Sequence, residues 1–121
     1  MLHLCIPRKN GHEVQVLVNE YTQYIASWIV GAYLTNETYD RRTMLWLAEE
    51  ALREYNDFSY GDFSTVHTMK FILPMSAPLA LPEALNHFEA LSENRVNRAR
   101  RMDAVTKIRA FVKKELSCLT T

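Results

Sequence analysis

The expected fold is organised around residues 10–34, with the sequence NGHEVQVLVNEYTQYIASWIVGAYL. Apolar side chains recur there at the i, i+3, i+4, i+7 spacing of an amphipathic helix. They are Val14, Leu17, Val18, Tyr21, Tyr24, Ile25, Trp28, Ile29, Ala32 and Tyr33. Asn10 followed by Glu13 matches a capping box, in which two residues satisfy free N–H groups at a helix start. We therefore predict one long helix over this stretch.

The other side of this predicted helix is only weakly polar, because no charged residue occurs between Tyr21 and Asn36. A helix that is apolar nearly all round is usually buried on two sides, which makes it the central element. If the other helices cover one side only, Val16, Ser27 and Val30 form the seam of a homodimer. The uncharged run spans 16 residues. A membrane-spanning helix needs about 20 apolar residues, so we expect no membrane association.

The composition favours a single helical domain covering residues 1–121. A chain of 121 residues can bury a hydrophobic core without disulfides or metals. With 3 glycines and 4 prolines, it favours helices over a turn-rich β architecture. Cys5 and Cys118 lie near opposite ends, which favours reduced thiols in a cytoplasmic protein over a disulfide. The formal net charge of +0 argues against bulk attraction to nucleic acid.

Further helical patterns follow residue 35. Their expected ranges are 41–56, capped by Asp40, then 64–73, 82–91 and 94–119. The last segment loses its single apolar stripe near Met102. We expect either a break there, with Asp103 capping a new helix, or one long helix whose first half contacts a different neighbour. The predicted fold is an all-α single-domain bundle of four to five helices around the central N-terminal helix.

Trp46 does not share the apolar face of the predicted 41–56 helix. It projects among charged residues, with Arg42 and Arg53 on the same side. One interpretation is that the N-terminal tail or a loop covers the indole. The other is that Trp46, Arg42 and Arg53 form an exposed anchor for a partner, because tryptophan beside arginine is the usual composition of an interface hot spot.

Charge is segregated along the chain although it sums to zero. Residues 94–114 contain eight basic side chains and one acidic one, whereas residues 37–63 are mainly acidic. Arg95, Arg98 and Arg101 recur at i, i+3, i+6 and are expected along one side of a helix. Either the two regions face each other or are solvated, or the arginines bind phosphate or an acidic partner. No DNA-binding motif accompanies them.

The sequence contains little that indicates catalysis or metal binding. The four histidines have no partner at a convincing metal-ligand spacing, and we find no nucleophile motif or glycine-rich phosphate loop. We expect no metal, no cofactor and no catalytic residue. One enzymatic alternative stays open, in which Glu54 and His67 share an acid–base cleft. Its lining would be Glu54, Tyr55, Asp57, Tyr60, Asp62 and His67.

A W-L … L … E-Y … Y-G … H string occurs in LWLAEEALREYNDFSYGD and shortly after it. Its positions are Trp46, Leu47, Leu52, Glu54, Tyr55, Tyr60, Gly61 and His67. The string resembles that of small phage-borne helical proteins grouped near the pyrimidine-dimer DNA glycosylases, and it implies a phage or mobile-element origin. Those glycosylases use an N-terminal amine after methionine removal. Here Leu2 favours retention of Met1, so the resemblance implies no catalytic residue.

Three functions are expected from these observations. The first is a small non-enzymatic interaction protein, such as an accessory or inhibitory factor of a mobile element, with a protein partner. The expected partner-binding residues are Trp46, Arg42, Arg53, Arg95, Arg98 and Arg101. The second is a nucleic-acid-binding protein that uses the basic C-terminal helix. The third is a DNA-directed enzyme with an acid–base cleft near Glu54 and His67.

Overall fold

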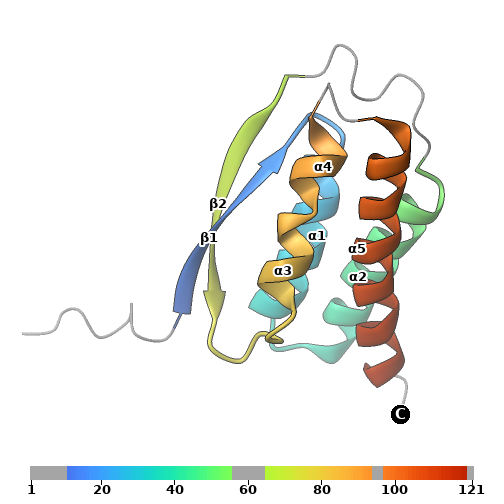
Figure 1. The fold of residues 1–121 in the computed structure, drawn as a ribbon. Helices are drawn as coiled ribbons and strands as arrows, with labels where there is room; N and C mark the ends of the chain where they lie inside the picture. Colours follow the sequence, from blue (N-terminus) through green and yellow to red (C-terminus); the bar gives the residue numbers. More distant parts are fainter. Residues whose placement is uncertain (1–10, 56–64, 94–96, 120–121) are drawn as a thin grey trace, which may run out of the picture.

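The computed structural model of the protein describes residues 11–55, 65–93 and 97–119. Its elements are β1 (Gly11–Val18), α1 (Thr22–Leu34), α2 (Thr38–Arg53), β2 (His67–Pro74), α3 (Leu81–Asn86), α4 (Phe88–Ser92) and α5 (Arg98–Leu119). The strands form an antiparallel sheet, so the predicted all-α fold is wrong and the protein is mixed α/β. Figure 1 shows the sheet on one side, α1 with α3 and α4 next to it, and α2 with α5 farther away.

The sheet replaces two predicted helical segments. β1 takes about the first third of the helix predicted over residues 10–34, and β2 takes most of the helix predicted over residues 64–73. In the register Val16 lies opposite Met69, and Val16, Val18 and Leu73 are buried. β-Branched valines favour a pleated surface with one buried face, and each strand supplies the backbone hydrogen-bond partners that the other needs.

A reciprocal set of hydrogen bonds ends β1 and starts α1. The N–H groups of Tyr21 and Thr22 donate to Asn19 Oδ1 at 2.8 and 2.9 Å, and the Asn19 N–H donates to Thr22 Oγ1 at 2.8 Å. This is the arrangement of a capping box. The capping box predicted at Asn10 and Glu13 is wrong, because Glu13 lies within β1, and Asn10 lies outside the described residues.

α1 is the central helix, as expected, and it contacts β1, β2, α2 and α4. Its second side is covered within the chain, because Ala26 and Val30 are buried. Val16 is buried as well, from β1. The predicted homodimer seam of Val16, Ser27 and Val30 is therefore wrong, since this chain itself buries the two valines. Homodimer formation itself stays a prediction.

The helices predicted over residues 41–56, 82–91 and 94–119 are confirmed, with shifted ends. α2 begins upstream of the expected cap Asp40. The helix predicted over residues 82–91 is divided into α3 and α4. Of the two alternatives for the last segment, the single long helix is confirmed, because α5 continues through Met102. Asp103 lies inside α5 instead of capping a helix, and its Oδ2 lies 3.0 Å from Lys107 Nζ.

The C-terminal end of α1 is fixed by Arg41 of α2 and Glu115 of α5. Arg41 Nε donates to the Ala32 carbonyl oxygen at 2.8 Å, and its guanidinium lies 5.2 Å from the Tyr33 ring centroid. Tyr33 Oη donates to Glu115 Oε1 at 2.8 Å. Burial and this carboxylate raise the pKa of Tyr33 above the ordinary range of a phenol. The hydroxyl therefore stays a donor, and the three helices stay joined at this end.

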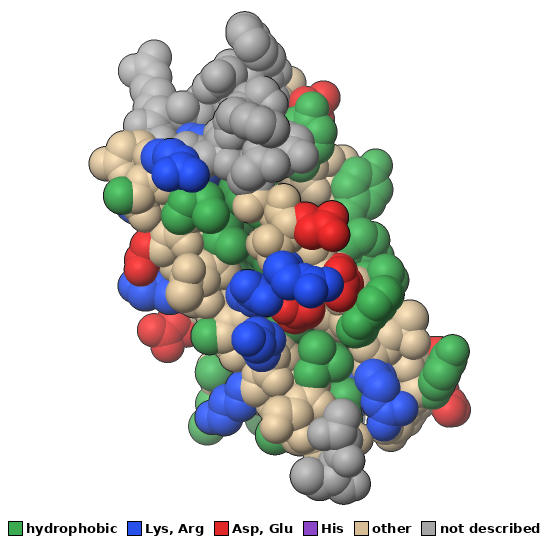
Figure 2. Space-filling view, turned by 90° about the vertical axis from the view of Figure 1, so that its right-hand side faces the viewer, with side chains coloured by type: hydrophobic (Ala, Val, Ile, Leu, Met, Phe, Trp, Pro, Cys, Tyr) green, Lys and Arg blue, Asp and Glu red, His purple; other side chains and the backbone are tan. Residues whose placement is uncertain are grey.

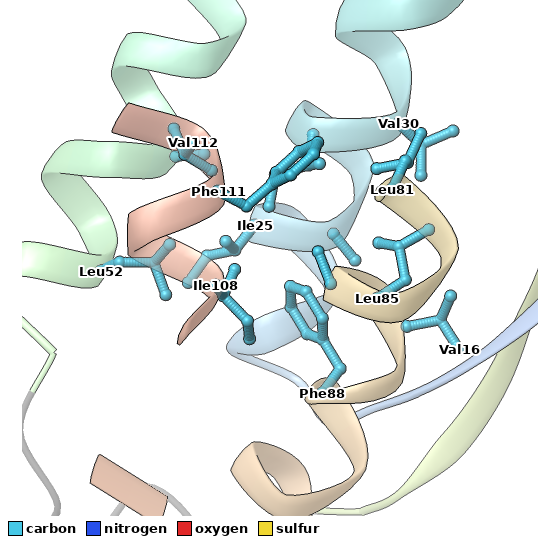
Figure 3. Close-up of a cluster of buried hydrophobic side chains, with 14 of the residues drawn as sticks. Val16, Ile25, Val30, Leu52, Leu81, Leu85, Phe88, Ile108, Phe111 and Val112 are labelled. Atoms are coloured by element: carbon cyan, nitrogen blue, oxygen red, sulfur yellow. The ribbon is translucent and has the colours of Figure 1, made fainter. Parts of the chain in front are cut away.

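The core is one hydrophobic cluster that takes side chains from every described element. Figure 3 shows the ring of Phe88 of α4 with Ile108 of α5 on one side and Leu85 on the other, and Val16 beyond Leu85. α4 is short, but it contacts α5, β1 and α1, so its buried side chains connect the sheet to the helices.

Candidate interaction site

A cleft opens between the start of α1 and the end of α2. Its volume is about 350 Å³, which falls in the range of ligand-binding pockets. The lining residues are Glu20, Tyr21, Tyr24, Ile25 and Trp28 on the α1 side, and Ala51, Glu54 and Tyr55 on the α2 side. Aromatic rings therefore make up much of its wall.

The start of α1 positions the aromatic side chains on one side of the cleft. Tyr21 precedes α1 in a helical conformation, and Tyr24 and Trp28 follow it at i+3 and i+7, so all three lie on one face. Across the cleft, Tyr55 is buried, and its Oη donates to a backbone carbonyl oxygen of α4 at 3.4 Å. The two walls are thus anchored to the same core through separate contacts.

Two carboxylates flank the rings, one on each side of the cleft. Glu20 precedes α1 and Glu54 follows α2, and both residues are exposed. None of the described residues that line the cleft is Lys, Arg or His. Arg53, next to Glu54 in the chain, is ion-paired with Glu50. The cleft is therefore both aromatic and acidic.

The outward face of α2 carries the predicted anchor. Trp46 is 53% exposed, and Tyr39, seven residues earlier on the same side, is 74% exposed. The indole of Trp46 is therefore accessible, as the anchor interpretation requires. Arg42 Nη2 donates to a backbone carbonyl oxygen of α5 at 3.1 Å and Arg53 pairs with Glu50, so both arginines are held by neighbouring groups. Figure 2, which faces the side of α2 and α5, shows hydrophobic side chains to the right of a mixed-charge centre.

The acidic and basic regions of the chain meet where α2 packs against α5. Arg109 Nε donates to Glu49 Oε2 at 2.8 Å, and the two side chains are 32% and 13% exposed. Partial shielding from water makes this pair stronger than a fully exposed one. The interpretation in which the two regions face each other is confirmed for this pair.

The predicted strip of Arg95, Arg98 and Arg101 is not an exposed row within the described structure. Arg101 is only 4% exposed, and its Nη2 donates to the Glu93 carbonyl oxygen at 3.0 Å. Arg98 is exposed at the start of α5, and Arg95 lies outside the described residues. Arg101 therefore ties α5 to the end of α4 instead of presenting its guanidinium at the surface.

A different basic row lies on the outer face of α5. Arg100, Lys107 and Lys114 recur every seven residues, which places them on one side of the helix, and all three are exposed. Asp103 pairs with Lys107 and partly offsets this charge. The row is thus a basic feature of α5 that faces solvent.

The enzymatic alternative gains no support from the described residues. Glu54 lines the cleft, but His67, at the first residue of β2, is not among the lining residues. Asp57, Tyr60 and Asp62 lie outside the described residues. Within the described ranges, no group of three His, Cys, Asp or Glu side chains is placed to hold a metal ion. Nor is any helix of these ranges long and apolar enough to cross a bilayer.

The α1 wall of the cleft is a feature that sequence reasoning missed. The helical pattern assigns Tyr21, Tyr24 and Trp28 to the inward face, but Tyr21 is 49% and Tyr24 60% exposed. The assignment fails because the helix starts only at Thr22, so the residues of β1 do not define its inward face. A signal was present in the three aromatic residues that follow Glu20 at regular spacing.

Comparison with known proteins identifies no relative. No protein-family model, no curated protein and no solved structure matches the chain. The resemblance to small phage-borne proteins stays a prediction, and the function has to be argued from the surface of this molecule.

Proposed function

We propose that the protein is a small non-enzymatic interaction protein that binds another protein through the outer side of α1 and α2. One observation carries the proposal. Tyr21, Tyr24, Tyr39 and Trp46, all on or next to these two adjacent helices, are between 49% and 74% exposed. Single exposed apolar side chains are ordinary, but a concentration of them is typical of an interaction site. Tyrosine and tryptophan are also the residues that dominate interface hot spots.

The proposed setting is the cytoplasm, where a phage or mobile-element factor of this kind acts on its host. Cys118 is exposed near the end of α5, and reduced thiols are the rule in the cytoplasm. Cys5 lies outside the described residues. An accessory or inhibitory role needs only that binding occupies a surface of the partner, so no catalytic group has to be supplied.

Replacing Tyr24 and Trp46 together by alanine is expected to weaken partner capture by about tenfold or more, because truncating central aromatic residues removes most of the binding energy of an interface. The measurement is affinity capture from the cells that naturally make the protein, with quantitative mass spectrometry. Leu79→Ala is the matched control, since Leu79 is 99% exposed in the loop before α3 and its loss should leave capture unchanged. Undiminished capture by the double variant would refute the proposal.

Nucleic-acid binding is the second candidate, and the exposed row of Arg100, Lys107 and Lys114 favours it. Lysine and arginine on one helix face neutralise backbone phosphates and release counterions, so affinity should fall steeply with salt. Replacing the three residues by glutamate is expected to abolish a gel shift at low salt, whereas Lys70→Glu on β2 should preserve it. Absence of any shift by the wild-type protein removes this candidate.

A further inference from the structure

We propose that the cleft between α1 and α2 is a receptor for the guanidinium of an arginine side chain that the protein partner presents. The inference rests on the proposed function and names the chemistry of the partner. Three properties of the cleft support it: its aromatic wall, its two carboxylates, and the negative end of the α2 helix dipole at its border.

The aromatic wall suits a flat cation. Tyr21, Tyr24 and Trp28 line one side of the cleft, and Tyr55 lines the other. The face of an aromatic ring carries negative charge density and attracts a cation within about 6 Å of its centroid, tryptophan most strongly. A guanidinium group is planar and weakly hydrated, so it stacks on such rings more readily than an ammonium group does.

The two carboxylates supply the opposite charge. Glu20 and Glu54 come from different elements and reach the cleft from its two sides. The lining residues in the described part of the chain include no basic side chain to neutralise them. Arginine donates hydrogen bonds in a fixed fork that matches a carboxylate, so either glutamate can hold the group while it lies against a ring.

The C-terminal end of α2 favours a cation in the cleft over an anion. The N–H groups of Tyr21 and Thr22, which an anion would use at the start of α1, already donate to Asn19 Oδ1. The C-terminal end of α2, at Glu54, carries the negative end of the helix dipole. The dipole of α2 therefore acts in the same direction as the two glutamates, whereas α1 presents its positive end and opposes them in part.

The floor of the cleft suits the aliphatic part of an arginine side chain. Ile25 and Ala51 contribute apolar surface between the two acidic rims. Arginine buries its methylene groups against such a surface while its charged end stays among polar partners. The cleft thus matches the whole side chain and not only its charge.

The test compares two short capped peptides, Gly-Arg-Gly and the same peptide with citrulline in place of arginine. Citrulline keeps the length and planar shape of arginine but is neutral, and a carbonyl oxygen replaces one of its terminal nitrogens. Backbone and indole N–H signals of the isotope-labelled protein are followed by NMR during titration to roughly 10 mM peptide, since an isolated side chain binds weakly. We expect saturable chemical-shift changes at Trp28 and Glu54. The dissociation constant of the citrulline peptide should be about tenfold higher than that of the arginine peptide.

Variants separate the cleft from the rest of the surface. Glu54→Gln and Tyr24→Ala should each weaken arginine binding severalfold. Glu37→Gln is the matched control, because Glu37 is exposed at the opposite end of α2 and its change should have no effect. Equal binding of both peptides, unchanged binding by Glu54→Gln, or no saturable shift would each overturn the inference. A partner captured through Tyr24 and Trp46 without arginine selectivity would leave the proposed function standing and reject the cation site alone.

Discussion

Replacing Phe88 by alanine is expected to lower the free energy of unfolding by about 3–5 kcal/mol. Phe88 is completely buried, and Figure 3 shows its ring pointing into the cluster beside Ile108. α4 contacts β1, α1 and α5 at once, so the surrounding side chains cannot collapse into the cavity without moving several elements. A domain of this size is stable by about 5–15 kcal/mol, so the loss is a large share of the total.

Urea denaturation followed by circular dichroism measures this effect. Phe71→Ala is the matched control, since Phe71 is only half-buried on β2 and the same deletion should cost roughly half as much. Equal losses for the two variants would contradict the central position of Phe88. If Phe88→Ala does not fold, Phe88→Leu leaves a smaller cavity and is measured in its place, with a smaller loss expected.

Replacing Asn19 by alanine is expected to destabilise the protein by about 3 kcal/mol. Asn19 Oδ1 accepts hydrogen bonds from the N–H groups of Tyr21 and Thr22, and Asn19 Nδ2 donates to the Ser92 carbonyl oxygen at 3.4 Å. Thr22 Oγ1 and Ser92 Oγ lie 2.8 Å apart in the same buried cluster. Alanine leaves several of these groups without a partner and out of reach of water, which costs more than the loss of an exposed cap.

Asn97→Ala is the matched control for this prediction. Asn97 Oδ1 accepts the Arg100 N–H at 2.8 Å at the start of α5, but the site is exposed, so water can replace the side chain. Its loss should cost only about 1 kcal/mol. If chemical denaturation gives the same loss for both variants, burial of the Asn19 cluster does not contribute as inferred.

The helices were largely predictable because their pattern is local. Leu45, Ala48 and Leu52 repeat on one side of α2, and Ile108 and Val112 do so on α5, and all five are buried. Such spacing describes one face of a helix whatever the partner is. The outward direction of Trp46 followed from the same geometry, since it falls outside the inward stripe.

The strands were not predictable in the same way. Val14, Leu17 and Val18 continue the helical spacing of α1, while Val14, Val16 and Val18 alternate as in a strand. Both patterns fit an apolar segment of this length. A strand also needs a partner for its backbone groups, and the partner of β1 lies far along the chain in β2.

Two residues of the candidate sites also differ from what their spacing in the sequence predicts. Arg101 has the spacing of a surface arginine, yet it is buried against the Glu93 carbonyl oxygen. Tyr24 has the spacing of a core residue, yet it is exposed at the cleft. In both cases the side of the helix that faces the core depends on how neighbouring elements pack, and a pattern within one segment does not contain that information.

The sequence by itself determined that α1, α2, α5 and the region of α3 and α4 are helical, that α1 is central and that Trp46 points outward, because each follows from the local spacing of apolar side chains. Only the tertiary structure decided that residues 11–18 form a strand, where α1 begins, and that Glu20 and Glu54 flank one aromatic cleft. The physical reason is that backbone pairing in a sheet and the meeting of two helix ends depend on contacts between distant segments.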